Sequence, residues 1–141
     1  MAANNNYLCL DVGEKRIGVA TANPLSRLAQ PHTTLVHDGQ IFDSISTLVT
    51  DLHVSRIIIG LPKNMHGEDT AQTSYIRQFS DALKSHVRNV AVDFQDEANT
   101  SQKAVTELTS RKGQYEKTDV DAVAATYILQ DYLDQNMGAA L

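Results

Sequence analysis

The chain has 141 residues, of which 42% are hydrophobic, and it carries a formal net charge of −5 at pH 7. This length suits one domain with one core, and no apolar run reaches the roughly 18 residues that a membrane span needs. The acidic balance argues against broad, unspecific nucleic-acid binding, but it is compatible with a local basic rim. The N-terminus shows no signal-peptide pattern, so we expect a cytoplasmic protein with frayed ends at 1–6 and 136–141.

Residues 7–52 predict three strands followed by a helix. Apolar runs over 7–12 and 16–22 stand on either side of a short charged turn. A third strand fits 28–36, where Pro31 would place it at a sheet edge or bend it. Beyond it, apolar residues recur with the spacing of one helical face: Ile41, Ile45, Leu48, Val49 and Leu52.

The next part of the chain alternates strands and helices. The β-branched run 54–60 predicts a strand buried on both faces, and the Gly- and Pro-containing stretch 60–69 predicts a loop. A helix over 71–83 and an alternating strand over 89–94 follow.

Two helices are expected after these strands. Asn99 or Thr100 could cap the first, and the second runs from about residue 118 to 135. Three strands in succession, followed by strands that alternate with helices, favour a mixed α/β sheet covered by helices. We expect a single domain over residues 1–141, because neither an internal repeat nor a second domain is legible.

Acidic residues stand where three of these elements begin or end. Asp11 ends the first strand, Asp96 and Glu97 end the last strand just after Phe94, and Asp119 and Asp121 open the last helix. If the first and last of these strands are parallel, their carboxyl ends meet at one sheet edge, which is where ligands bind in open α/β sheets. We therefore expect the acids to converge there.

Helical periodicity separates the two aspartates of the last helix. At 100° per residue, Asp121 shares a stripe with Ala124, Ala125, Ile128 and Tyr132, whereas Asp119 falls on a more exposed flank. Asp121 thus stands at the start of the inward-facing stripe. Taken alone, it could instead complement the helix dipole.

Each of the other acids also has a structural interpretation when taken alone. Asp11 could begin a turn, and the Asp96-Glu97 pair could be a solvated turn. Together, converging carboxylates repel one another, and a divalent cation would relieve that cost. Oxygen ligands suit Mg²⁺ or Mn²⁺, and the five histidines and the single, apolar-flanked Cys9 show no zinc-binding spacing.

Four segments occur in the order of a known family's motifs: "LDVGEKRIGVA" (10–20), "IIIGLPKNMHG" (57–67), "DEANTS" (96–101) and "DVDAVAATYILQDYL" (119–133). The set resembles the YqgF/RuvX family of pre-16S rRNA nucleases and Holliday-junction-resolvase-like proteins. The resemblance covers about residues 7 to 134, and its first two motifs are the specific ones.

The resemblance implies an RNase H-like fold: a five-stranded mixed sheet in the order 3-2-1-4-5, with helices on both faces. It also implies a metal-dependent endonuclease for structured nucleic acid, with Asp11, Glu97 and Asp121 as catalytic residues and ligands of Mg²⁺ or Mn²⁺. The family is linked to processing of the 5′ end of the 16S rRNA precursor in ribosome biogenesis. One departure removes a natural phosphate contact: Ala98 and Asn99 stand where the family usually has Arg and Leu.

Basic and polar residues near these motifs are candidates for substrate binding. Lys15 and Arg16 could meet the phosphate backbone, or could form only a solvated turn tip. Lys63 and Asn64 could contact phosphate or sugar from a loop that otherwise simply covers the sheet edge. Lys117 could bind phosphate or remain an exposed charge.

Other functions stay open at this point. The runner-up substrate is a four-way DNA junction, whose symmetric cleavage would require a two-fold dimer. A catalytically weak nucleic-acid-binding module fits the missing Arg. "DVGEKRIGVA" also resembles the first phosphate loop of actin-like ATPases, which normally need a second such domain. We expect a monomer or weak homodimer that binds precursor rRNA or branched DNA and no membrane.

Overall fold

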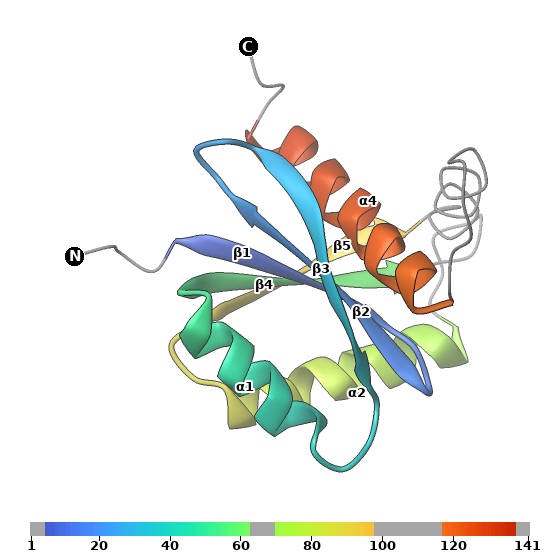
Figure 1. Ribbon diagram of the computed structural model, residues 1–141. Coiled ribbons are helices and arrows are strands. Elements are labelled where there is room, and N and C mark those ends of the chain that lie inside the picture. The colour runs from blue at the N-terminus through green and yellow to red at the C-terminus, as the bar shows by residue number, and fades with distance from the viewer. Residues whose placement is uncertain (1–4, 63–69, 98–116, 138–141) are drawn as a thin grey trace.

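The protein folds into a five-stranded mixed sheet with helices on both faces (Figure 1). The structure is a computed structural model that describes residues 5–62, 70–97 and 117–137. Its elements are β1 (Asn6–Val12), β2 (Arg16–Asn23), β3 (Leu28–Val36), α1 (Ile41–Asp51), β4 (Val54–Pro62), α2 (Ala71–His86), β5 (Ala91–Glu97) and α4 (Lys117–Met137). No helix in these ranges is long and apolar enough to span a membrane.

The strand order is β3-β2-β1-β4-β5, which confirms the predicted topology. β1 pairs with β2, and β2 with β3, in antiparallel fashion, whereas β4 lies parallel to both β1 and β5. The carboxyl ends of β1, β4 and β5 therefore share one edge of the sheet. β3 is an edge strand and is irregular opposite Val19 and Ala20, as expected for a strand that contains Pro31.

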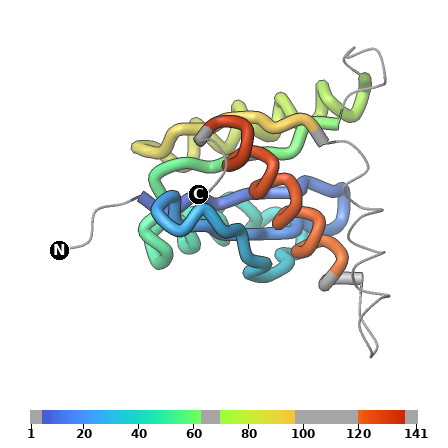
Figure 2. The backbone as a smooth tube through the Cα atoms, turned by 90° about the horizontal axis from the view of Figure 1, so that it is seen from above, coloured from blue at the N-terminus to red at the C-terminus, as the bar shows by residue number. Residues whose placement is uncertain are grey.

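Helices α1 and α2 cover one face of the sheet, and α4 covers the other (Figure 1). Seen from above in Figure 2, α4 lies in front of the strands and crosses them. The face toward α1 and α2 buries large aliphatic side chains, such as Leu8, Leu10, Ile57 and Ile59. The face toward α4 uses smaller residues, including Cys9, Ala20 and Ala22, so the helix can approach the strands closely. Cys9 is fully buried.

Several element boundaries differ from the sequence-based expectation. β4 runs on to Pro62 and pairs with β5, which begins at Ala91 and ends at Glu97. Asp96 and Glu97 therefore end the strand as expected and do not form the alternative solvated turn; the strand extends beyond the predicted range 89–94, because the longer β4 offers backbone partners as far as Pro62. α4 begins at Lys117 and ends at Met137, slightly beyond both expected ends. The helix expected after Asn99 lies outside the described residues.

Gly18 sets the distance between α4 and the sheet. A Cβ atom placed on Gly18 would lie 1.9 Å from the carbonyl oxygen of Asp121 and 2.3 Å from its carbonyl carbon. The backbone of α4 near its start therefore rests directly on β2. Any side chain at position 18 would have to push the helix away from the sheet.

Replacing Gly18 with alanine should destabilise the fold by about 3 kcal/mol, near the upper end for overpacking, because the clashing atoms belong to the backbone and cannot rotate away. Gly39→Ala is the matched control, since nothing lies within 4 Å of its added Cβ, and it should change stability by less than about 0.5 kcal/mol. Urea unfolding of both variants tests this. Equal stabilities would contradict the proposed close approach.

Candidate active site

Asp11 and the start of α4 meet at the carboxyl-terminal edge of the sheet. Asp11 is paired with Gly18 across the β1–β2 ladder, and the backbone carbonyl of Asp121 packs directly against Gly18. Since side chains alternate along a strand, Asp11 faces the same side as Cys9, which packs against α4. Three residues from β1, β2 and α4 thus stack at one place, and two of them carry carboxylates.

Arg16 neutralises one of these carboxylates. Its Nε donates to Oδ2 of Asp121 over 2.6 Å, which joins the first residue of β2 to α4 across 105 positions of sequence. The side chains remain 38% and 24% exposed, respectively, so the ion pair borders solvent. The stripe predicted for α4 is confirmed: Ala124, Ala125, Ile128 and Tyr132 are all buried.

The remaining predicted residues are only partly described. Lys15 is exposed at the turn between β1 and β2. Glu97 ends β5 opposite Pro62, and Lys117 begins α4, but their side chains lie outside the described part. Lys63 and Asn64 also lie outside it. Among the predicted residues whose side chains are described, the structure brings Asp11, Arg16 and Asp121 together.

The donor set suits a hard divalent cation. Asp11 and Asp121 offer carboxylate oxygens at the edge where the parallel strands end, and Asp121 already holds a positive charge in the form of the Arg16 guanidinium. Within residues 5–62, 70–97 and 117–137, no three His, Cys, Asp or Glu side chains form a metal-binding group. A third ligand would have to come from a side chain such as that of Glu97.

His37 holds the hairpin that carries Asp11 and the basic pair. Its Nδ1 lies 2.6 Å from the carbonyl oxygen of Gly13 and donates there, because a carbonyl can only accept. Its backbone N–H donates to the carbonyl of Lys15 over 2.9 Å, and its ring packs edge-on against Phe79 at 5.5 Å. The sequence carries no signal for this role of His37, since the contact joins segments that no local pattern relates.

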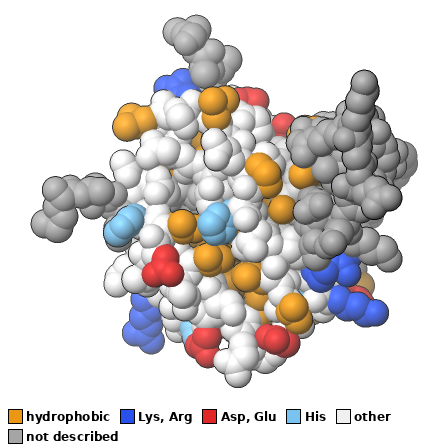
Figure 3. Space-filling model, viewed as in Figure 1, with side chains coloured by type: hydrophobic (Ala, Val, Ile, Leu, Met, Phe, Trp, Pro, Cys, Tyr) orange, Lys and Arg blue, Asp and Glu red, His pale blue; other side chains and the backbone are white. Residues whose placement is uncertain are grey.

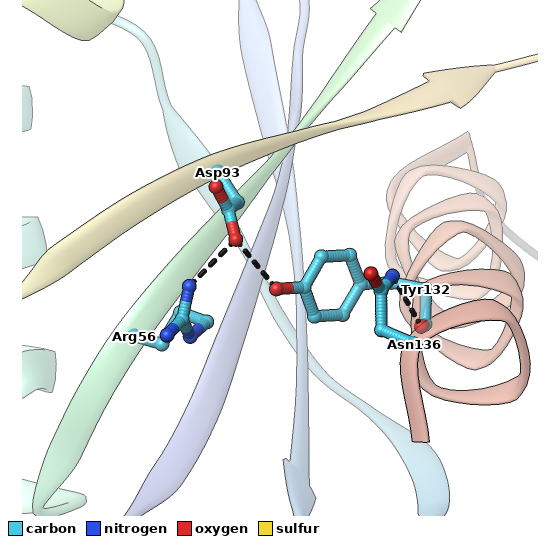
Figure 4. Close-up of polar contacts among 4 residues, drawn as sticks. All are labelled: Arg56, Asp93, Tyr132 and Asn136. Carbon is cyan, nitrogen blue, oxygen red and sulfur yellow. Dashed lines mark hydrogen bonds and ion pairs between the residues drawn. The ribbon is translucent and has the colours of Figure 1, made fainter. Parts of the chain in front are cut away.

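A second polar cluster holds α4 further along the same face (Figure 4). Asp93 on β5 accepts from Arg56 Nη1 and from the Tyr132 hydroxyl, each over 2.6 Å. Asn136 donates to the carbonyl of Tyr132 over 2.9 Å. Burial, together with this hydrogen bond to Asp93, raises the pKa of Tyr132 to about 12. The sequence carried no signal for this cluster beyond the inward phase of Tyr132.

Basic side chains do not form one broad surface on the face shown in Figure 3. They lie there in separate small groups, one of them near the β1–β2 hairpin. This pattern agrees with the net charge of −5 and with the expectation of a local basic rim.

A family model described as "RuvX: Holliday junction resolvase" matches residues 5–135. A protein of Sulfurihydrogenibium sp. (strain YO3AOP1), named as a candidate pre-16S rRNA nuclease, is 37% identical over 132 residues, which cover 93% of this chain and 91% of that protein. A protein of Chloroflexus aggregans with the same name is 43% identical over 131 residues, covering 90% and 92%.

Solved structures share the fold at low identity. The RuvC protein of T. thermophilus in complex with a Holliday junction substrate matches with a TM-score of 0.58 at 11% identity, covering 96% of this chain and 97% of that one. The Holliday junction resolvase of fowlpox virus matches with a TM-score of 0.57 at 15% identity, covering 92% and 99%. Their sheet and helices support the RNase H-like assignment.

The raised pKa of Tyr132 predicts a loss of stability at high pH. Between pH 10 and about 12 the unfolded tyrosine ionises while the folded one keeps its proton, so the free energy of unfolding should fall as pH rises. Tyr132→Phe should be about 1–2 kcal/mol less stable than the wild type at pH 8, because Asp93 loses a donor. It should also show a shallower decline above pH 10.

Tyr75→Phe is the matched chemical control, since it removes a hydroxyl group from a side chain that is 40% exposed. Urea unfolding at pH 8, 10 and 11 compares the three proteins. A Tyr132→Phe curve parallel to the wild-type curve would show that Tyr132 does not titrate as described.

Proposed function

Because this chain belongs to the RuvX family of Holliday junction resolvases, we propose that it is a metal-dependent endonuclease that processes the 5′ end of the 16S rRNA precursor. We choose this substrate because of the names of its relatives: proteins that are 37–43% identical over about nine-tenths of the chain are named for pre-16S rRNA. This activity belongs to ribosome biogenesis in the cytoplasm.

We propose Asp11, Glu97 and Asp121 as the catalytic residues and the ligands of Mg²⁺ or Mn²⁺. The support for Asp11 and Asp121 is their meeting at Gly18, with a positive charge already held by Asp121. The support for Glu97 over Asp96 is its position in β5, two residues after Gln95 and four after Asp93, both of which contact α4. Bound there, the cation would supply charge stabilisation for a phosphodiester under attack.

The chain's own basic residues would hold the substrate. Lys15 stands exposed on the turn next to Asp11, and Arg16 stands on the strand that follows. Lys63, Asn64 and Lys117 remain candidates for the same role. The His37 bonds to the hairpin keep Lys15 and Arg16 at a fixed position relative to Asp11, so the substrate phosphates and the carboxylates share one rigid frame.

A four-way DNA junction is the second candidate substrate. The description of the family model favours it, and one of the solved structures with this fold is bound to such a junction. Cutting a junction symmetrically would require two copies of the chain related by a two-fold axis, so this function would also imply a homodimer in place of a monomer.

A cleavage assay with both substrates side by side distinguishes these functions. Precursor rRNA carrying the unprocessed 5′ end and a synthetic four-way junction are each incubated with the protein and with Mg²⁺ or Mn²⁺. We expect cleavage of the precursor. Faster cleavage of the junction would favour the resolvase, and binding of either substrate without cleavage would support a catalytically weak binding module, consistent with Ala98 in the place of the usual Arg.

Asp11→Asn should reduce cleavage to background and leave the protein folded, because it removes a proposed metal ligand while keeping the size of the side chain. Asp81→Asn, on the exposed side of α2, makes the same chemical change far from the sheet edge and should cleave normally. Rates and urea midpoints of both variants test this. An Asp11→Asn protein that does not fold would assign Asp11 a structural role.

A further inference from the structure

Backbone contacts fix both the strand that carries Arg16 and the helix that carries its partner, Asp121. It begins β2, its carbonyl accepts from the N–H of Gly13 over 2.9 Å, and two residues later on the same face Gly18 supports the carbonyl of Asp121. The main chains on either side of the Arg16–Asp121 ion pair are therefore fixed relative to each other. Only the long arginine side chain has to move for the pair to open.

The geometry of the Arg16–Asp121 ion pair is that of a weak pair, which can open and re-form. It joins one guanidinium nitrogen to one carboxylate oxygen, whereas the strongest Arg–carboxylate pairs use two of each. Arg16 is 38% exposed, and pairs at this exposure are weak. Asp93 presents a contrast, because its carboxylate is held from two sides by Arg56 and Tyr132.

A cation held by Asp121 would compete with the guanidinium of Arg16 for that carboxylate. A divalent cation held by this carboxylate would lie close to the positive charge of Arg16, whose Nε is 2.6 Å from Oδ2 of Asp121. Like charges at such separations repel, and the solvent-bordering arginine is the partner that can leave. Once released, its planar fork of donors matches a phosphate group.

Building on the proposed metal-dependent function, we propose that the side chain of Arg16 moves between Asp121 and a substrate phosphate. In the metal-free protein it neutralises Asp121. When a divalent cation binds at Asp121, Arg16 leaves and contacts the nucleic-acid backbone. Cation binding and nucleic-acid binding therefore strengthen each other, since a coupling between two sites is necessarily reciprocal.

The first test measures the competition without any cleavage. Mn²⁺ is titrated calorimetrically into the full chain, Arg16→Gln and Lys15→Gln. Arg16→Gln should bind Mn²⁺ about two- to five-fold more tightly, the gain expected from removing a partly exposed competing ion pair. Lys15→Gln is the matched control: it removes the same charge from the next residue, which is exposed on the turn, and its Mn²⁺ affinity should stay within about 1.5-fold of wild type.

The second test measures the transfer to phosphate. Binding of a fluorescent four-way junction is followed over a range of salt, with and without Ca²⁺ as a cation chosen to limit turnover. In the wild type, Ca²⁺ should steepen the slope of log K against log salt by about 0.9, the value for one added phosphate contact. Arg16→Gln should lose this steepening, whereas Lys15→Gln should keep it on a shallower slope.

The outcomes separate this inference from the proposed function. Three results would each overturn the transfer by Arg16: equal Mn²⁺ affinity in the wild type and Arg16→Gln, an equal gain in affinity in Lys15→Gln, or Ca²⁺-dependent steepening of the salt slope that survives in Arg16→Gln. If the wild type still cleaved normally, the proposed nuclease function would stand. A wild type that binds no Mn²⁺ would overturn both the metal site and the transfer. Circular dichroism confirms that each variant is folded.

Discussion

The close approach of α4 to β2 at Gly18 is the constraint on which the rest of the site depends. With no side chain at that position, the carbonyl of Asp121 rests on the strand, directly across the ladder from Asp11. The small residues Cys9, Ala20 and Ala22 continue the same surface along the helix. Two carboxylates from opposite ends of the sequence can share one location only because the two backbones come this close.

One face of the sheet holds most of the apolar core, and the other face holds the polar contacts of α4 and the proposed site. Toward α1 and α2 the strands bury a large aliphatic core, where apolar burial supplies most of the favourable free energy of folding. Toward α4 the contacts are more polar: Asp93 binds Tyr132, Gln95 binds Gln135, and Gln130 bonds the backbone of the β2–β3 connection and β3. These bonds hold α4 independently of Arg16, so the Arg16–Asp121 pair can open without detaching the helix.

Charge explains how an acidic chain can bind a polyanion. The net charge of −5 disfavours broad electrostatic attraction, and the described basic side chains near the site belong to one hairpin. Arg16 in that hairpin faces a carboxylate, so part of the basic rim is neutralised in the structure. An endonuclease built in this way would bind substrate weakly without metal, which limits unproductive binding to the many other nucleic acids of the cell.

The sequence by itself determined the described strands and helices, the mixed sheet and the places of Asp11 and Asp121 in their elements, because strand and helix periodicity are local properties that a run of a dozen residues displays. Only the tertiary structure decided which groups meet. The bonds of Arg16 to Asp121, of Tyr132 to Asp93 and of His37 to Gly13 join residues 105, 39 and 24 positions apart, and no local pattern relates such partners. The same reason explains the end of β5: strand length is set by the partner strand, and β4 continues to Pro62.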